Sequence, residues 1–100
     1  MRGTETNELV AHVVSGNVEQ LRVLLDRAPA DGMLPDGVTH LMLAAACGHE
    51  PVVELLLQCG ADPARRDRHG LSAAAYARQA GHPHLAERLD TVVDQEKVMW

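Results

Sequence analysis

The sequence has no phenylalanine, one tyrosine and one tryptophan among its 100 residues, although 46% of them are hydrophobic. A core of alanine, leucine and valine suits close packing between helices better than it suits a sandwich of sheets. The scarcity of aromatic rings also removes the stacking platforms that bind single-stranded nucleic acid. The formal charge of −5 argues against binding to nucleic-acid phosphates. These shortages favour a small helical protein for which no nucleic-acid partner is expected.

Long apolar runs are also missing. No stretch approaches the roughly 18 consecutive apolar residues that a membrane helix needs, and the N-terminal MRGTETNELV lacks the apolar centre of a secretory signal. The two cysteines, Cys47 and Cys59, match neither a disulfide framework nor a zinc motif. We interpret them as free thiols in a reducing compartment. The expectation is a cytoplasmic protein without membrane contact.

Two short apolar segments, LMLAAAC and VVELLL, lie between residues 36 and 63. Each is too brief to persist as an isolated helix in water. Gly48 separates them and Gly60 follows the second, and a glycine just past a helical run suits the left-handed turn that ends a helix. Pro51 stands near the start of the second segment, where its missing N–H costs nothing. The pattern predicts two helices joined by a tight turn, with a loop on each side.

The same pattern recurs further along the chain, at a period of about 33 residues. A period of this length and content is typical of stacked helical hairpins that bury their apolar faces against one another. The shift by one period aligns Gly37 with Gly70, Thr39 with Ser72, Ala44 with Ala77, Gly48 with Gly81, His49 with His82, Glu54 with Glu87, and Leu56 with Leu89.

On these residues the chain resembles the ankyrin-repeat family, whose period is also about 33 residues. The matching motifs are Thr39-His40-Leu41-Met42 for T-P-L-H, Ala44-Ala45 for the paired alanines, Gly48-His49 for the inter-helix G-H, and Gly60-Ala61-Asp62 for G-A-D. There are departures as well: His40 replaces proline, Met42 replaces histidine, and Ala73-Ala74-Ala75 replace the whole P-L-H run. The resemblance covers nearly all of the chain and implies an all-α ankyrin-repeat solenoid of stacked helix-turn-helix units.

We expect one domain over residues 1–100, with repeats at approximately 5–33, 34–66 and 67–100. The first repeat should hold helices over residues 8–14 and 18–27, capped by Asn7 and Asn17. Because it lacks the T-P-L-H and G-A-D elements, we interpret it as a capping repeat. Arg88 and Asp90 stand where the middle repeat has Leu55 and Leu57, so the last repeat is interpreted as the second cap, with nothing stacked beyond it.

Two alternatives stay open for the tail, whose apolar residues include Val98, Met99 and Trp100. It either extends the last helix over the open end of the stack or leaves a hydrophobic terminus for a partner.

No catalytic constellation emerges from the sequence, and no cofactor is expected. Cys47 and His49 are two positions apart and would face different ways on a helix, without the orienting group that a Cys–His nucleophile needs. His12 replaces the first small alanine of its repeat, where we expect a partly buried packing role. The resemblance implies that His49 and His82 hydrogen-bond between turns. No set of three or four convergent metal ligands is apparent among the six histidines.

What remains is surface, because the family usually meets partners through loop tips and the exposed side of each first helix. Carried onto this chain, the resemblance points to a strip that is small and apolar at one end and cationic at the other. Arginine pairs bidentately with carboxylates and is enriched at binding hot spots. The alternative is a solvated charged loop without a partner. The candidate residues are Pro35, Asp36, Val38, Ala46, Cys47, Arg66, Arg68, His69, Leu71, Arg78 and Gln79.

The favoured hypothesis is a non-enzymatic module that binds a protein with an acidic surface. The alternative is a small free-standing inhibitor or immunity-type protein that blocks one enzyme or toxin. A small enzyme or metal protein is the third hypothesis, disfavoured because no site is apparent. No small-molecule substrate, nucleic acid or membrane is expected as a partner.

Overall fold

Helices joined by loops make up the part of the chain that this computed structural model describes, residues 10–25 and 37–97, with side chains as far as residue 93. Residues 10–15 are helical. The later helices are α2 (Val18–Leu25), α3 (His40–Cys47), α4 (Glu50–Gln58), α5 (Ala73–Gln79) and α6 (Pro83–Lys97). The predicted all-α fold is therefore confirmed, and each repeat is a pair of helices joined by a short turn.

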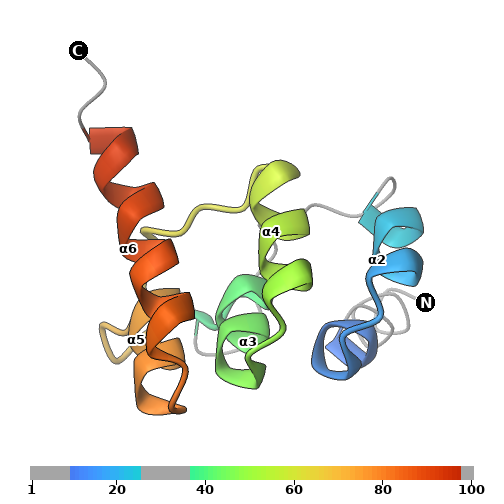
Figure 1. Cartoon of the computed structure of the whole chain (residues 1–100), viewed down its shortest axis with the longest axis horizontal. Coiled ribbons are helices and arrows are strands. Elements are labelled where there is room, and N and C mark those ends of the chain that lie inside the picture. The colour runs from blue at the N-terminus through green and yellow to red at the C-terminus, as the bar shows by residue number, and fades with distance from the viewer. Residues whose placement is uncertain (1–9, 26–36, 98–100) are drawn as a thin grey trace.

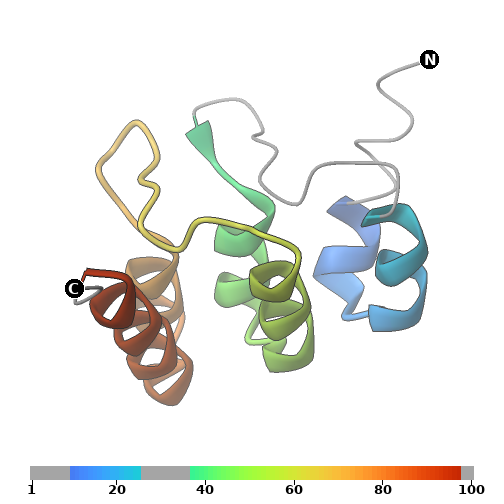
Figure 2. The same cartoon turned by 90° about the horizontal axis from the view of Figure 1, so that it is seen from above.

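The pairs stand side by side in a row, so the helices form two layers (Figure 1). One layer holds α2, α4 and α6, and the other holds residues 10–15, α3 and α5. Seen from above, the segment between α4 and α5 projects from one edge of the row (Figure 2). The helix α6 has 15 residues against 9 in α4 and extends past it (Figure 1).

Local capping explains where the middle helices begin and end. The Thr39 hydroxyl accepts a hydrogen bond from the Met42 N–H at 3.2 Å, and the Thr39 N–H points back to the Met42 sulfur at 3.3 Å. Gly48 ends α3 with a φ of 74°, a left-handed conformation that favours glycine. Pro51 lies in the first turn of α4. These positions agree with the predicted helix, turn and helix.

One apolar cluster runs through all three pairs and joins them into a single core. The middle repeat supplies just over half of it, since it packs against a neighbour on each side. The buried apolar residues are Val13, Leu21, Leu41, Met42, Ala44, Ala45, Val52, Val53, Leu55, Leu56, Ala61, Ala73, Ala74, Ala77, Leu85, Ala86 and Leu89.

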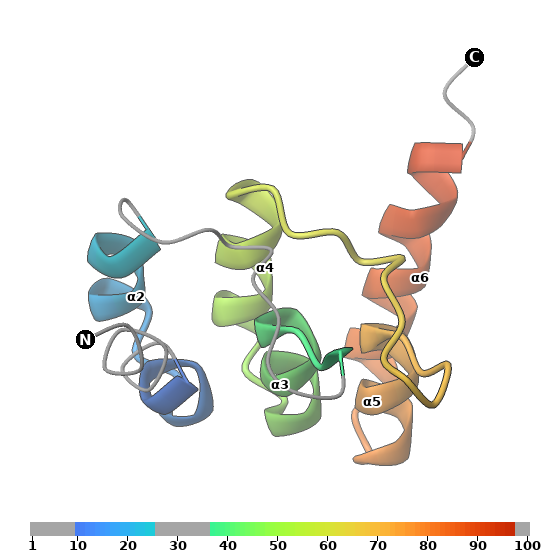
Figure 3. The same ribbon diagram turned by 180° about the vertical axis from the view of Figure 1, so that it is seen from behind.

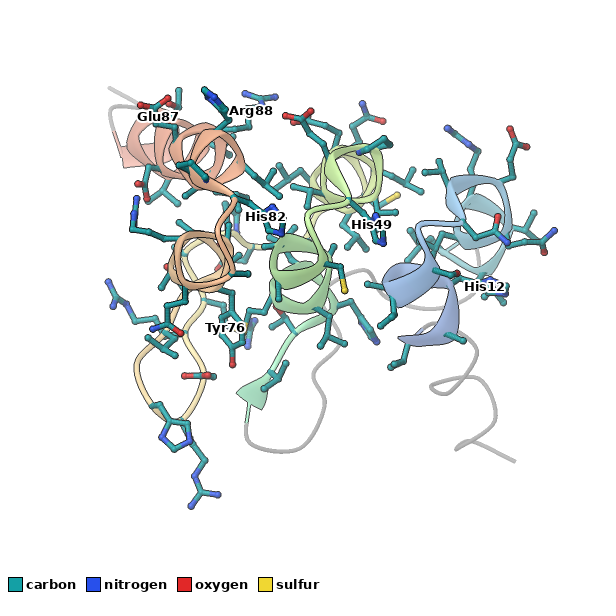
Figure 4. The ribbon with its side chains drawn as sticks, turned by 60° about the horizontal axis from the view of Figure 1, so that its bottom comes forward. His12, His49, Tyr76, His82, Glu87 and Arg88 are labelled. Carbon is teal, nitrogen blue, oxygen red and sulfur yellow. The ribbon has the colours of Figure 1, made fainter. Side chains whose placement is uncertain are left out.

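Histidines at the turns join consecutive repeats. The His49 Nε2 lies 2.7 Å from the Val14 carbonyl oxygen, the hydrogen bond between turns that the family resemblance implies. His82 packs against Gly48, where a Cβ would lie 2.6 Å from its Cε1 atom. Each ring lies on the side of its turn that faces the preceding repeat (Figure 4). The His49 ring lies against Gly16 in the same way. We call the His49–Gly16 and His82–Gly48 packings the histidine–glycine contacts.

Arg88 differs from the sequence-based expectation that it faces an open end. Its Nε and Nη2 atoms donate to Glu54 on α4 at 2.7 and 2.9 Å, so it turns back toward the middle repeat (Figure 4). These hydrogen bonds lower the pKa of the Glu54 carboxyl group. Asp90 instead accepts a hydrogen bond from Arg78 of α5 at 2.8 Å. Both polar replacements are therefore paired within the fold.

Some expectations lie outside the described residues: the Asn7 cap, residues 8–9 and 26–27 of the first two helices, and the tail Val98, Met99 and Trp100. Among the described residues, 10–15 are helical and α2 starts at Val18. The Asn17 side chain accepts a hydrogen bond from the Gln20 N–H at 3.4 Å. His12 is half-buried, as expected of a packing residue.

Candidate functional site

The cationic end of the candidate surface is a turn built around Asp67, which is only 7% exposed. One carboxylate oxygen of Asp67 accepts from the N–H groups of His69 and Leu71 at 2.8 and 2.9 Å. The Asp67 N–H donates to the Leu71 carbonyl, and the Gly70 N–H donates to the Asp67 carbonyl, both at 3.0 Å. The polar groups of residues 67–71 are thus largely satisfied within the turn, which fixes its shape.

Tyr76 of α5 ties this turn to the helical body. Its hydroxyl donates to the second oxygen of Asp67, and the ring lies on the side of α5 that faces the turn (Figure 4). The Tyr76 hydrogen bond and the Leu71 N–H, with a smaller contribution from His69, lower the pKa of Asp67, although burial opposes the shift. Asp67 is therefore ionised at neutral pH, which strengthens each hydrogen bond that it accepts.

The turn also touches the segment that precedes α3. A Cβ at Gly37 would lie 3.4 Å from the Asp67 Cα and 3.5 Å from the Arg68 nitrogen. The backbones of two successive loops are therefore in contact, and residues 37–38 and 67–71 form a continuous edge.

The cations of this edge are exposed. The Arg66 Nη1 donates to the Gly70 carbonyl at 3.0 Å, so its guanidinium lies against its own turn. Arg68 and His69 are also exposed. An arginine has five N–H donors, and the Gly70 carbonyl takes one of those on Arg66, so most of that guanidinium's hydrogen-bonding capacity can meet a carboxylate.

The apolar end of the surface lies on the first helices. Ala46 and Cys47 are half-buried at the end of α3, and Gln79 is exposed at the end of α5. These two helices stand side by side in one layer (Figure 3). Val14 was not predicted as a candidate, although it holds the position equivalent to Ala46 in the first repeat and is 46% exposed. The same alignment of the first two repeats could have revealed it.

The structure places the eleven candidates unevenly. Pro35 and Asp36 lie outside the described residues. Arg78 pairs with Asp90 of α6 at 2.8 Å, and its side chain stays exposed. The roles of Asp67 and Tyr76 were not predicted from the sequence, because their contact spans nine residues and depends on the fold. The described candidates, all at least partly exposed, are Val38, Ala46, Cys47, Arg66, Arg68, His69, Leu71, Arg78 and Gln79.

Other kinds of site find little support in the described residues. Among them, no group of three or more His, Cys, Asp and Glu side chains is arranged to hold a metal ion. Cys47 and Cys59 are both free thiols. Over the same part of the chain, every helix falls short of the length and apolar character needed to cross a membrane. What this surface offers chemically is charge, hydrogen-bond donors and small apolar patches.

Comparison with known proteins identifies the fold family. The family described as ankyrin repeats (3 copies) matches residues 9–94 of the chain. The chain belongs to the ankyrin-repeat family. The predicted recognition is therefore confirmed, and this ankyrin-repeat chain carries the general role of its family, protein interaction through a repeat surface.

Several larger proteins contain a similar stretch. The chain is 44% identical over 86 residues to the human ARF GTPase-activating protein GIT1, which covers 84% of the chain and 11% of that relative. It is 43% identical over 77 residues to the mouse ankyrin repeat and SAM domain-containing protein 6, covering 74% of the chain and 9% of the relative. The chain thus spans about a tenth of the length of the curated relatives it matches.

Proposed function

We propose that this ankyrin-repeat chain binds a partner protein through the edge formed by residues 37–38 and 66–71 together with the exposed side of α3 and α5, whose C-terminal ends carry Ala46, Cys47 and Gln79. The observation that carries the proposal is the turn at Asp67, held internally by hydrogen bonds and tied to α5 by Tyr76. A rigid turn loses little conformational entropy on binding, which favours recognition. The proposed activity is binding without catalysis, in a cytoplasmic setting.

The chemistry of the turn favours an acidic partner. Arg66 and Arg68 supply exposed guanidinium groups in a chain whose overall charge is −5. A local cationic site on an acidic protein steers carboxylate-bearing partners to that site while the rest of the surface repels them. Ala46 and Cys47, half-buried at the C-terminal end of α3, add apolar contact area at the other end of this helix from the charged edge.

Charge reversal tests the proposal. The variant with Arg66→Glu and Arg68→Glu should lose the partner at physiological salt while keeping the helical circular-dichroism spectrum, because both side chains are exposed. The matched control is Arg22→Glu, an exposed arginine on α2 outside the edge. Partners are captured from native extract with the wild-type chain, identified by mass spectrometry and measured again with both variants. Retention by the double variant, or equal loss with the control, would contradict the proposal.

An inhibitor that blocks one enzyme or toxin is the alternative, and it uses the same surface. The two functions differ in the number of partners, since an adaptor holds two proteins at once and an inhibitor holds one. The similarity to segments of much larger proteins favours the interaction module. Stoichiometry of the purified complex separates them: two different proteins bound to one chain indicate an adaptor.

A further inference from the structure

The turn before α5 and α5 itself carry two polar residues where the preceding period of the sequence has leucines. One period earlier, Asp67 corresponds to Leu34 and Tyr76 to Leu43. The Tyr76 hydroxyl donates to one carboxylate oxygen of Asp67. The other oxygen accepts from the Leu71 N–H at 2.9 Å. Two leucine side chains cannot form such a hydrogen bond, so this pair distinguishes the second loop from the first.

The peptide group between Gly70 and Leu71 is held at both of its polar ends. Its N–H belongs to Leu71 and donates to the Asp67 carboxylate. Its carbonyl belongs to Gly70 and accepts from the Arg66 Nη1 at 3.0 Å. The N–H and C=O of a trans peptide group lie in one plane, point in opposite directions and turn together. The hydrogen bond that fixes the Leu71 N–H therefore also fixes the carbonyl against which the Arg66 guanidinium lies.

The orientation of the Arg66 guanidinium matters because this side chain is exposed and has further N–H donors. A guanidinium binds a carboxylate best through two parallel hydrogen bonds in its own plane, so the pairing depends on direction as well as on charge. A guanidinium held against a fixed carbonyl loses less conformational freedom on pairing than one that rotates freely. The hydrogen bonds behind Arg66 should therefore affect how well it binds a carboxylate.

Resting on the proposed function, we infer that Arg66 is the residue of the edge that pairs with an aspartate or glutamate of the partner, and that Tyr76 is its positioning residue. Tyr76 acts through the Asp67 carboxylate and the peptide group between Gly70 and Leu71, without touching the partner. The partner's carboxylate lies in the plane of the guanidinium and accepts two hydrogen bonds from it. Specificity for the acidic partner thus depends on a tyrosine hydroxyl of α5 as well as on the positive charge of the turn.

Two conservative variants test the inference. Tyr76→Phe removes only the hydroxyl, and Arg66→Lys keeps the charge but removes the planar fork of donors. The probe is acetyl-Asp-Asp-Asp-amide, titrated at low salt and pH 7.5 into the ¹⁵N-labelled chain and followed by the amide shifts of residues 66–71. Each variant should bind the probe about threefold or more weakly, the scale of one lost hydrogen bond. The control Arg22→Lys, at an exposed arginine of α2 outside the edge, should bind as the wild type does.

A double-mutant cycle distinguishes positioning from a general loss of stability. If Tyr76 acts through the guanidinium, Tyr76→Phe should weaken the probe little further in a chain that already carries Arg66→Lys. Asp67→Asn interrupts the same path, because an amide nitrogen cannot accept a hydrogen bond, and should behave in the same way if Tyr76→Phe does not fold. The uncharged acetyl-Asn-Asn-Asn-amide should leave the amide shifts unchanged.

Three results would overturn the inference. The first is an equal loss of affinity from Tyr76→Phe, or from Asp67→Asn in its place, with and without Arg66→Lys. The second is wild-type affinity for the aspartate probe in Arg66→Lys or in the variant that interrupts the path. The third is equal binding of the aspartate and asparagine peptides.

The natural partner separates this inference from the function on which it rests. If charge reversal at Arg66 and Arg68 releases the partner while Arg66→Lys and Tyr76→Phe keep wild-type affinity for it, the binding edge stands and the positioning role is wrong. If the charge-reversed chain also retains the partner, the proposed function fails as well. The expected result is release by charge reversal and weaker binding by both conservative variants.

Discussion

At the scale of single residues, His40 departs from the family pattern and leaves buried ring nitrogens without hydrogen-bond partners in the described part of the chain. It is the first residue of α3 and is 4% exposed. Neither ring nitrogen has a hydrogen-bond partner among the described residues. A buried polar group without a partner costs about 1–3 kcal/mol. Burial also lowers the pKa of His40, so the ring stays neutral in the folded chain at pH values where the unfolded chain binds a proton.

The variant His40→Pro should be more stable than the wild type. The proline ring fixes the φ that the first residue of a helix needs. Thr39 is extended, with a ψ of 163°, which suits the position before a proline. The unfolded chain also loses entropy, which contributes about 0.4–1 kcal/mol. Urea unfolding at pH 7.5 measures this gain. An unchanged or lower midpoint would show that the buried imidazole contributes more through packing than its unsatisfied nitrogens cost.

The same substitution should flatten the pH dependence of stability. Because the folded pKa of His40 lies below its ordinary value of 6.5, the unfolded state takes up the proton first as the pH falls. The wild type should therefore lose stability below about pH 6.5, by up to ~1.4 kcal/mol per pH unit. His40→Pro should lack this slope, whereas His84→Ala, at an exposed histidine, should keep it. If the free energy of unfolding falls with pH equally in all three proteins, titratable groups other than His40 cause the loss.

At the scale of helices and turns, the histidine–glycine contacts determine how repeats stack. Gly48 serves twice, since it ends α3 in the left-handed conformation and leaves room for the His82 ring of the next repeat. Gly81 also has a positive φ, of 88°, but no described heavy atom lies within 4 Å of the place where its Cβ would be. Gly48 and Gly81 both need the left-handed backbone conformation, but only Gly48 also needs to lack a side chain because of a neighbouring ring.

Alanine substitutions at these turns should differ in their effects. Both Gly48→Ala and Gly81→Ala place a side chain in the left-handed region, at about 1–2 kcal/mol each. Only Gly48→Ala also forces a methyl group to 2.6 Å from His82, so it should destabilise the chain more. Urea unfolding of the two variants and the wild type measures the difference. Equal losses would mean that the His82 ring moves aside without cost.

The sequence predicted the helices and turns of the middle repeat because Gly48, Gly60 and Pro51 mark their limits. It did not predict the direction of Arg88. The repeat period identifies equivalent positions, but the neighbour that each faces depends on the stacked helices. The Tyr76–Asp67 hydrogen bond was missed for the same reason.

Across the whole molecule, burial is concentrated in the middle repeat. The first pair of helices contributes only two fully buried apolar side chains among its described residues, Val13 and Leu21. It also carries the two exposed large apolar residues of the described chain, Val14 at 46% and Val23 at 56%. The middle repeat has apolar neighbours on both sides, as expected of an interior unit in a stack. Its buried apolar helical residues are Leu41, Met42, Ala44, Ala45, Val52, Val53, Leu55 and Leu56.

Native-state hydrogen exchange should follow this distribution. The amides of α3 and α4 should exchange most slowly, near the free energy of global unfolding, and those of residues 10–15 and α2 should exchange at least about tenfold faster. The reason is that opening the first pair exposes little apolar surface. Mass spectrometry of exchanged peptides gives the order. Equal protection in all repeats would show that the stack unfolds as one cooperative unit.

Among the described residues, no histidine ring packs against Gly81, so the turn of the third repeat is a place where the stack could be extended. Each described junction has a glycine in the earlier repeat and a histidine ring from the later one, at Gly16 with His49 and at Gly48 with His82. Gly81 is the equivalent glycine of the third repeat and could pack against a histidine ring in the same way. An engineer could graft a fourth hairpin, beginning with Gly-His at its own turn, onto this end without altering any existing junction, and so lengthen the molecule one module at a time.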